Sequence, residues 1–269
     1  MEQTIPIPEP FELEPEVPGR RIRLLSYNIQ VAIGSTRFRD YLTESWKHVL
    51  PHAQSYETLG RIARAISEFD IVALQEVDAG SLRTSYVNQI EFLAKKAGFP
   101  FWYHQTNRRI GNIARHSNGL LSHLRPSEVI NHKLPGILPG RGVMQVRYGH
   151  HDNPLVLLVV HMALGSRARQ RQFEYIAELV NAQRHVVVMG DLNCQPDSPE
   201  MRFLLSATDL CEPCHGLKTY PSWRPVRTID HILTSRSLYV HDVHVMQHLL
   251  SDHLPIATEI VLPDDLGLI

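Results

Sequence analysis

The chain has 269 residues, with 27 Lys and Arg against 28 Asp and Glu, so its formal net charge is −1. A composition of 43% hydrophobic and 20% charged residues is typical of a globular protein and excludes a disordered chain. The balanced charge excludes a global positive field that would bind nucleic acid unspecifically, and it leaves open a local basic stripe. The three cysteines, Cys194, Cys211 and Cys214, are too few for a disulfide framework and fit a reducing compartment.

The first residues differ in composition from the rest. Residues 1–18 hold five Pro and five Glu and no Lys or Arg, so residues 1–20 are predicted to form an extended acidic arm, with a docked arm as the alternative. Residues 21–269 are expected to form a single domain. The start of the chain lacks the basic flank and apolar core of a secretory signal, and no apolar run is long enough to span a membrane. We therefore expect a cytoplasmic protein without stable membrane insertion.

The first half of the chain predicts strands alternating with helices. Residues 21–27 alternate as a strand does, and residues 55–69 have helical spacing with one apolar face. Residues 71–74 are apolar and branched, as in a buried strand. Residues 86–97 are predicted to form a helix that Gly98 ends. Further short strands are expected at residues 101–103, 119–122, 127–132 and 143–148.

The second half continues the pattern. The strand at 143–148 is expected to form a hairpin with residues 155–160, because a turn signal lies between them. Ser166 is a candidate N-cap for a helix over 167–181, and Ser198 followed by Pro199 opens a helix that reaches residue 207. The remaining strands are expected at residues 186–189, 229–233, 239–246 and 256–262. Hairpins and helix crossovers both occur, which favours mixed sheets covered by helices.

Polar residues stand at the ends of the buried strands. Asn28, Glu76, His161 and Asp191 each follow an apolar strand. Asp230 begins a later strand, and residues 251–253 (Ser-Asp-His) precede the last one. If these later strands run antiparallel to the earlier ones, all of these side chains meet at one rim of the sheets.

The chemistry of this set favours a hard divalent cation. Carboxylates and amide oxygens, here Glu76, Asp191, Asp252, Asn28 and Asn193, suit Mg²⁺ or Mn²⁺. A histidine beside a carboxylate can act as a general acid or base. Metal, histidine and amide donors together indicate hydrolysis of a phosphate ester. Taken singly, Asn28 and residues 191–193 are more typical of turns than of a metal site.

Seven short segments, in this order, resemble the endonuclease/exonuclease/phosphatase superfamily of deoxyribonuclease I-like hydrolases. They are Ser-Tyr-Asn (26–28), Leu-Gln-Glu-Val (74–77), Asn-Gly-Leu-Leu-Ser (118–122), Val-His (160–161), Gly-Asp-Leu-Asn (190–193), Thr-Ile-Asp-His-Ile (228–232) and Ser-Asp-His-Leu-Pro (251–255). The resemblance covers about residues 21–262. It implies a four-layered α/β sandwich of two mixed sheets flanked by helices, and Mg²⁺-dependent cleavage of phosphoesters.

The resemblance also implies roles for single residues. Glu76 resembles the principal metal ligand, Asn28 the metal-site asparagine and Asp252 a metal- or water-linked neighbour. Asp230 and His253 resemble the family's carboxylate–histidine pair. The remaining three resemble residues that act on the phosphate and the attacking water, and these are Asp191, Asn193 and His161.

Our hypothesis for the reaction follows from these roles. The metal on Glu76 polarises a phosphoryl oxygen, and His253, held by Asp230, takes a proton from the attacking water. Asn193 and His161 donate hydrogen bonds to the developing charge. The chain departs from the family pattern at His123, where many members carry an arginine after the serine.

Three segments near the predicted rim are candidates for substrate contact. The long connection at residues 29–54 is predicted to be a lid, with a packed surface helix as the alternative. Residues 219–225 (Thr-Tyr-Pro-Ser-Trp-Arg-Pro) resemble a bacterial branch of metal-dependent hydrolases that is related to enzymes of glycosylphosphatidylinositol remodelling and to neutral sphingomyelinases. Arg167, Arg169 and Arg171 are first interpreted as a solvated helix face, and alternatively as contacts to a phosphate-rich ligand.

We therefore predict a Mg²⁺-dependent phosphodiesterase or phosphatase, with Mn²⁺ as a possible substitute, acting on a small or lipid-derived phosphate ester. The second hypothesis is a nuclease of the same fold, which would make nucleic acid the partner. The third is a catalytically inactive binding module. The sequence does not determine the oligomeric state or the leaving group.

Overall fold

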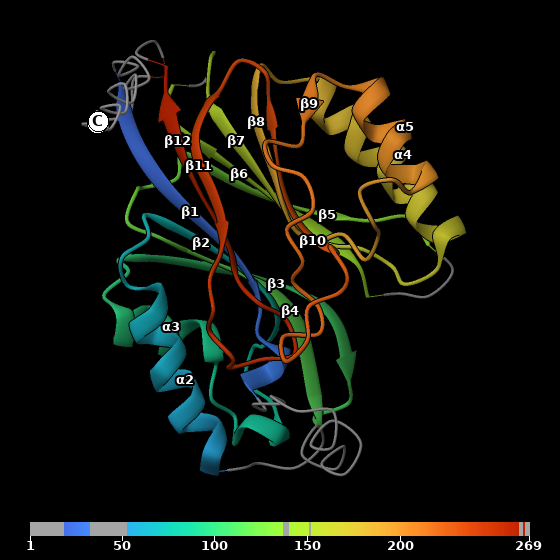
Figure 1. Cartoon of the computed structure of the whole chain (residues 1–269). Coiled ribbons are helices and arrows are strands. Elements are labelled where there is room, and N and C mark those ends of the chain that lie inside the picture. The colour runs from blue at the N-terminus through green and yellow to red at the C-terminus, as the bar shows by residue number, and fades with distance from the viewer. Residues whose placement is uncertain (1–18, 33–52, 137–139, 151, 264–265, 267–269) are drawn as a thin grey trace, which may run out of the picture.

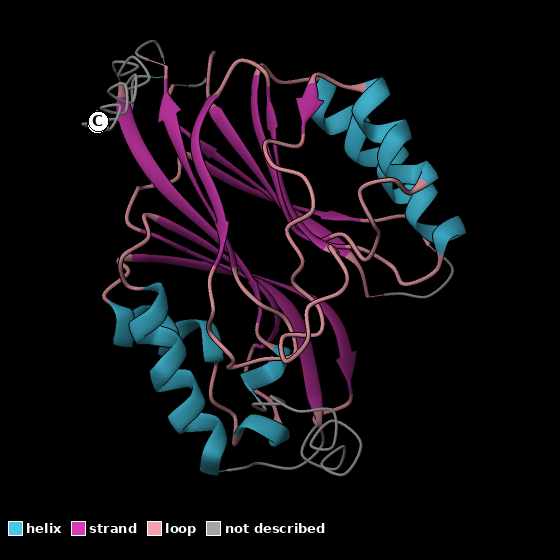
Figure 2. Cartoon of the chain, in the orientation of Figure 1, coloured by secondary structure: helices cyan, strands magenta, loops and turns pink. Residues whose placement is uncertain are grey.

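Two β-sheets are stacked face to face in the computed structural model, and two helices cover the outer face of each (Figures 1 and 2). The structure describes residues 19–32, 53–136, 140–150, 152–263 and 266. This arrangement is the predicted four-layered α/β sandwich. The predicted acidic arm lies outside the described residues, except for its last two positions.

The first sheet has six strands in the order β11-β12-β1-β2-β4-β3. Their bounds are β1 (Arg20–Asn28), β2 (Ile71–Asp78), β3 (Phe101–Ile110), β4 (Ala114–Ser122), β11 (Tyr239–Val245) and β12 (Ile256–Leu262). β1 and β2 run parallel, and the other neighbours are antiparallel. The last strand therefore runs back against the first, which brings the turn before β12 to the carboxyl end of β1.

The second sheet has six strands in the order β5-β6-β7-β8-β10-β9. Their bounds are β5 (Glu128–Lys133), β6 (Gly142–Tyr148), β7 (Leu155–His161), β8 (His185–Asp191), β9 (Leu210–Cys211) and β10 (Asp230–Ser235). β7 and β8 are parallel, whereas β6–β7 is the expected antiparallel hairpin and β10 runs antiparallel to β8. The sequence did not predict β9, because two residues are too short to show a period.

The helices follow their predicted apolar faces, with corrections at their ends. α2 (Ala53–Ile66) ends three residues earlier than predicted. α3 (Gln89–Ala97) begins after Asn88, whose side chain accepts from two backbone N–H groups, so the predicted start at residue 86 was wrong. α4 (Ser166–Asn181) is preceded by Gly165, so Ser166 is the first helical residue and not the cap. α5 (Pro199–Ala207) has Ser198 as its cap, as predicted. Two single-turn helices, at Gln30–Ala32 and Leu82–Thr84, complete the described part.

Three apolar clusters hold the layers together. One lies between the sheets and includes Leu24, Leu157 and Ile260. A second joins the first sheet to α2 and α3, and a third joins the second sheet to α4 and α5. Burial of each large apolar side chain contributes about 1.5–3 kcal/mol relative to exposure, so these clusters fix the sheets rigidly beneath the rim where the polar residues stand.

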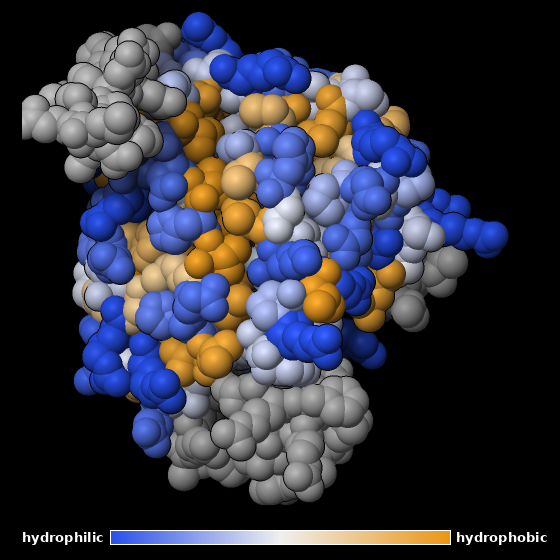
Figure 3. Space-filling model, viewed as in Figure 1, coloured by the Kyte–Doolittle hydropathy of each residue, from blue (hydrophilic) through white to orange (hydrophobic). Residues whose placement is uncertain are grey.

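The surface in the view of Figure 1 is mostly hydrophilic, with apolar residues gathered in a narrow band over the strands (Figure 3). Among the described residues, no helix has the length and apolar character needed to cross a bilayer.

Gly190 is required by the close approach of two parallel strands. It faces Val160 across the β7–β8 pair and has φ +150°, and an added Cβ would collide with the Val160 carbonyl oxygen. We expect Gly190→Ala to lower the free energy of unfolding by about 3 kcal/mol or more, since the clash involves backbone that cannot move freely. Urea unfolding followed by circular dichroism measures this change.

Gly60 provides the matched control, because it lies in α2 with open space around its Cα. Gly60→Ala should raise the free energy of unfolding by about 0.5–1 kcal/mol. Equal effects of the two substitutions would contradict the close strand approach at Gly190.

Candidate active site

The predicted polar residues meet at one end of the stacked sheets. In the second sheet, His161 at the end of β7 is the register partner of Asp191 at the end of β8. Asp191 is in turn the partner of Asp230 at the start of β10. The antiparallel arrangement that the sequence analysis required therefore exists, and it places these three residues side by side on neighbouring strands.

Glu76 is turned into the site by a bulge in β2. The β2–β4 register shifts between Leu74 and Val77, and Glu76 has φ +54°, a left-handed conformation that glutamate rarely adopts. Such strain persists only where the surrounding structure imposes it, and it concentrates at functional sites. The bulge interrupts the alternation of an otherwise buried strand and leaves the Glu76 side chain one-third exposed.

Asn28 connects the two sheets at the centre of the site. Its amide Nδ2 donates to Glu76 Oε1 at 3.3 Å and to Asp191 Oδ2 at 3.2 Å, and its Oδ1 accepts from the Gln30 N–H at 3.1 Å. Two carboxylates from different sheets thus accept hydrogen bonds from the same amide group. Asn28 is a donor to both, so this structure does not show it as an oxygen ligand.

Asn193 closes the turn after β8. Its backbone N–H donates to Asp191 Oδ1 at 2.9 Å, and its amide donates to the Met162 carbonyl at 3.0 Å. Like Glu76 it has φ +54°. The turn holds Asp191 in a fixed orientation, which is the turn chemistry that the sequence also favoured, and one amide N–H of Asn193 is occupied by the backbone.

His253 and Asp230 form a hydrogen-bonded pair. The His253 Nδ1 lies 2.9 and 3.1 Å from the two Asp230 oxygens, and the Thr219 hydroxyl donates to Asp230 Oδ2 at 2.5 Å. The Tyr220 ring lies against the imidazole, with centroids 4.9 Å apart. These contacts fix the ring so that Nε2 points towards Asp191, 4.0 Å from Oδ2.

His161 lies between the carboxylates and a guanidinium. Its Nε2 is 3.5 Å from Asp191 Oδ2 and 3.9 Å from Glu76 Oε1, while Arg141 Nη1 lies 3.2 Å from its Nδ1. Arginine has no acceptor, so Nδ1 accepts and Nε2 carries the proton. Burial, and secondly Arg141, hold the pKa of His161 well below its usual value, which keeps the ring neutral.

Asp252 is buried beside His253 in the turn before β12. Its Oδ1 accepts from the Ser251 hydroxyl at 3.2 Å, and its backbone carbonyl accepts from the Ser222 N–H at 2.7 Å. Burial raises the pKa of Asp252 to about 6, in spite of the nearby His253 charge. It is the fourth carboxylate of the site, after Glu76, Asp191 and Asp230.

The charges of the site are unbalanced towards the negative. Burial, and next the charge of Asp230, raise the pKa of Asp191 to about 7. Burial lowers the pKa of His253, but the charge and hydrogen bond of Asp230 outweigh burial, Asp191 and Asp252 add to them, and the pKa rises to about 10. Four buried or half-buried carboxylates therefore face one imidazolium, and a divalent cation would offset the excess.

The donor set fits such a cation. Asp191, Asp230 and His253 each offer a ligand atom within 4.8 Å of the others. In that group, however, Asp230 and His253 Nδ1 already bond each other, and Asp230 also accepts from Thr219. Glu76 and Asp191, joined through Asn28, retain oxygens for a metal, and the partly exposed Glu76 faces the adjoining cavity. Hard oxygen donors of this kind suit Mg²⁺ or Mn²⁺.

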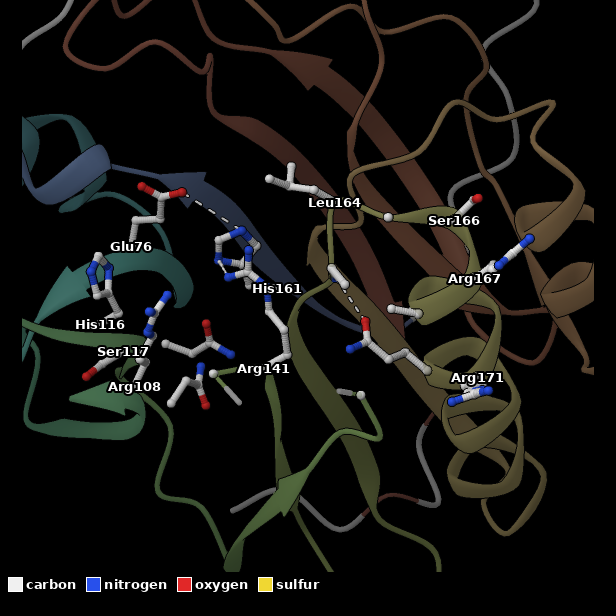
Figure 4. A pocket seen from close by; sticks show the side chains of 18 residues that line it. Glu76, Arg108, His116, Ser117, Arg141, His161, Leu164, Ser166, Arg167 and Arg171 are labelled. Atoms are coloured by element: carbon white, nitrogen blue, oxygen red, sulfur yellow. Dashed lines mark hydrogen bonds and ion pairs between the residues drawn. The ribbon is translucent and has the colours of Figure 1, made fainter. Parts of the chain in front are cut away.

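A cavity of about 990 Å³ opens beside Glu76 and His161. Figure 4 shows these two residues with Arg108, His116 and Arg141 on one side, and the start of α4 on the other. The remaining predicted site residues do not line this cavity, and they are Asn28, Asp191, Asn193, Asp230, Asp252 and His253. The cavity is large enough to hold a small-molecule ligand.

The sequence analysis missed three residues of the site. Thr219 holds Asp230, Tyr220 packs on His253 and Arg141 contacts His161. The motif at residues 219–225 drew attention to this loop, but not to the contacts of its threonine and tyrosine. Arg141 stands before a strand with no pattern that distinguishes it from a surface arginine.

The other rim predictions have mixed outcomes. Residues 33–52 of the predicted lid lie outside the described part of the chain. Arg169 is buried and pairs with Glu200 at 2.6 Å, so its assignment to a solvated face was wrong. Arg167 and Arg171 are exposed and line the cavity. His123 packs its ring on Phe99, with centroids 4.4 Å apart, and does not line the cavity.

Comparisons with known proteins agree with the fold. The model of the Endonuclease/Exonuclease/phosphatase family matches residues 25–253. An endonuclease/exonuclease/phosphatase from Beutenbergia cavernae superposes with a TM-score of 0.69 at 19% identity, covering 90% of this chain and 72% of that one. Mannosyl-6-phosphatase from Bacteroides thetaiotaomicron superposes with a TM-score of 0.67 at 17% identity, and the match covers 90% of this chain and 100% of that one. The human Nocturnin catalytic domain with bound sulfate superposes with a TM-score of 0.66 at 18% identity, and the match covers 90% of this chain and 94% of that one. No curated protein matches the sequence.

The raised pKa of Asp252 has a consequence for stability. Its folded-state value of about 6 exceeds its ordinary value of 3.8, so the folded protein binds this proton more tightly than the unfolded chain. The resulting stabilisation is present below about pH 4 and lost as the pH rises through 6. In the presence of a chelator at pH 8, we expect the Asp252→Asn protein to be more stable than the unmodified protein. Its free energy of unfolding should be higher by up to about 3 kcal/mol. The difference should shrink towards pH 4, as urea unfolding at pH 4, 6 and 8 will measure.

Asp209 is the matched control, because it is exposed and, in the part of the chain that the structure describes, forms an ion pair only with exposed Arg236 at 3.6 Å. Asp209→Asn should change stability by less than about 1 kcal/mol at each pH. An Asp252→Asn protein that is less stable than the unmodified chain at pH 8 would contradict the charge excess.

Proposed function

The chain belongs to the endonuclease/exonuclease/phosphatase family, whose members hydrolyse phosphate esters, and from this premise we propose that it is a divalent-metal-dependent phosphoesterase acting on a small or lipid-derived phosphate ester. The observation that carries the proposal is the convergence of Glu76, Asp191 and the Asp230–His253 pair on one site. An inactive binding module, the hypothesis from another class, has no need of strained and mutually repelling carboxylates at its centre.

Glu76 and Asp191 are the residues proposed to hold the metal, with Mg²⁺ as the first candidate and Mn²⁺ as the second. When bound there, such an ion supplies Lewis-acid polarisation of a phosphoryl oxygen. Asn28 positions both carboxylates through its amide. Asp252 contributes negative charge from the adjoining turn, and its proposed link to the metal is indirect.

His161 is proposed to bind the substrate phosphate. Its Nε2 proton points into the space between Glu76 and Asp191, and Arg141 supports the ring from the other side. A neutral imidazole held by a guanidinium is a fixed donor, and such preorganised donors stabilise charge that develops in the transition state. Asn193 is proposed to contribute chiefly by holding Asp191, because one of its amide hydrogens serves the backbone.

Proton transfer is divided between Asp191 and His253. Asp191 is buried beside the proposed metal position and lies 4.0 Å from Nε2 of His253, so a carboxylate oxygen that does not bind the metal is placed to accept a proton from the attacking water. The imidazole of His253, whose pKa the carboxylates raise, is a cation at neutral pH in the absence of metal. The position of Asp191 supports it as the base for the attacking water. The protonated state of His253, which Asp230 orients, supports it as the donor to a phosphoryl oxygen. The role of base, which the sequence assigned to His253, is thereby proposed for Asp191.

The substrate is proposed to be a small molecule. A cavity of about 990 Å³ beside Glu76 suits a ligand of nucleotide or phosphosugar size. The similarity to a mannosyl-6-phosphatase supports a small phosphate ester. The net charge of −1 gives little electrostatic attraction for a long nucleic acid, which places a nuclease second.

Hydrolysis assays with Mg²⁺ or with chelator test the proposal. We expect turnover of small phosphate esters, represented by bis-p-nitrophenyl phosphate and p-nitrophenyl phosphate, to require the metal. Glu76→Gln and His253→Gln should each reduce turnover at least about 100-fold, because each removes an interaction with the reacting phosphate. Circular dichroism must show that both variants remain folded, and Gly60→Ala serves as the active control.

Plasmid DNA and sphingomyelin complete the panel. Cleavage of DNA in preference to the small esters would favour the nuclease. No turnover of any of these substrates by the folded, metal-loaded protein would favour the binding module.

A further inference from the structure

The wall of the cavity carries more positive charge than hydrolysis of one phosphate requires. Beyond His161, the basic side chains lining it are Arg108, His116, Arg141, Arg167 and Arg171, and Glu76 is the only lining carboxylate among the described residues. Within the described part of the chain, none of the four arginines has a carboxylate within 4.0 Å. Arg169, which lies on α4 between Arg167 and Arg171, differs from them because it forms an ion pair with Glu200.

Arg108 and His116 form the first element of this basic wall. They are register partners on β3 and β4, so their side chains leave the sheet on the same face. Burial, and then Arg83 with a smaller contribution from Arg108, lower the pKa of His116. Arg108 therefore supplies the charge of this pair, and a neutral His116 beside it can donate one hydrogen bond.

Arg141 is the second element and stands beside Arg108. The stem of Arg108 passes over Gly140, where an added Cβ would lie 3.0 Å from Arg108 Cβ and 3.2 Å from its Cδ. Gly140 has φ +118°, so a glycine is needed both for the turn and for this close passage. The two guanidinium groups thus come from adjoining chain segments, and Figure 4 shows both on the Glu76 side of the cavity.

This basic wall lies one imidazole ring away from the proposed reaction centre. Arg141 contacts Nδ1 of His161 at 3.2 Å, and Nε2 of the same ring faces Glu76 and Asp191. An anion held by Arg108 and Arg141 would therefore lie close to the scissile phosphate without occupying its position. Guanidinium groups bind phosphate oxygens in bidentate fashion, which makes phosphate the fitting anion.

The cavity is also lined by a neutral hydrogen-bond acceptor, the side-chain oxygen of Asn118. Asn118 is fully buried and donates to the Gly142 carbonyl at 3.2 Å, while its Oδ1, among the described residues, has no hydrogen-bond donor. An unpaired buried acceptor is costly, and a substrate hydroxyl would satisfy it. This acceptor therefore fits a ligand that carries a hydroxyl group.

We propose that Arg108, His116 and Arg141 form a second phosphate subsite, so that the substrate is a small hydroxyl-bearing molecule with another phosphate near the scissile one. This inference deepens the proposed function and rests on it for the position of the scissile phosphate. Arg108 is the specificity-determining residue of the subsite, since it does not touch the residues at the reaction centre described above.

Binding to the metal-free full-length chain tests the subsite separately from hydrolysis. Isothermal titration calorimetry in chelator compares adenosine 3′,5′-bisphosphate with adenosine 5′-monophosphate, and fructose 1,6-bisphosphate with fructose 6-phosphate. We expect the bisphosphate of at least one pair to bind at least about tenfold more tightly. The pair with the larger gain indicates whether the body is a nucleoside or a sugar.

Two arginine variants separate the subsite from general electrostatics. Arg108→Gln should abolish the preference for the bisphosphate. Arg109→Gln should preserve it, because Arg109 neighbours Arg108 on β3, points to the other face of the sheet and does not line the cavity. Equal binding within both pairs, or an equal loss of preference in both variants, would overturn the subsite.

Kinetics then distinguish the two proposals. If the bisphosphate preference is found in binding but no phosphate ester is hydrolysed with metal, the subsite stands and the proposed function fails. If monophosphates are hydrolysed without any gain from a second phosphate, the function stands and the subsite is wrong. Tighter binding of a single-stranded oligonucleotide than of either bisphosphate, also lost in Arg108→Gln, would overturn the small-molecule assignment.

Discussion

The site depends on a row of register partners at the end of the second sheet. His161, Asp191 and Asp230 lie on neighbouring strands β7, β8 and β10, and hydrogen bonding of the sheet fixes their order. The first sheet supplies Asn28, whose amide reaches Asp191 across the sandwich. The site therefore forms only when the two sheets pack against each other. A slip of one of these strands by one residue against its neighbours would turn its side chain to the opposite face.

The same arrangement stores unfavourable energy where the chemistry is expected. Glu76 and Asn193 both have left-handed backbone, and four carboxylates share a largely buried space with one imidazolium. The three apolar clusters hold these groups in place, so the rest of the fold compensates for the strain. The excess of negative charge prepares the site for a cation on one side, while the cavity's arginines, which have no carboxylate partner among the described residues, prepare it for anions on the other. A phosphate ester with its metal satisfies both.

Sequence patterns predicted the fold well because burial dominates its strands and helices. Apolar runs such as residues 155–160 and 186–189 are long enough to identify, and Ser198 with Pro199 marks a helix start by local chemistry alone. Helix ends were less predictable where a competing cap existed, as at Asn88. The position of Glu76 could be foreseen, but not the bulge that aims it, since a bulge has no sequence period. Thr219 and Arg141 were missed because their roles come only from contacts made across the folded chain.

The binding of a divalent cation at Glu76 and Asp191 is the central claim, and thermal unfolding with and without Mn²⁺ at pH 8 tests it most directly. If the ion offsets the buried negative charge, a saturating concentration should raise the melting temperature of the unmodified protein by several degrees, and Glu76→Gln should lose most of that shift. An equal shift in both proteins, or none in the unmodified chain, would contradict a metal site at this position.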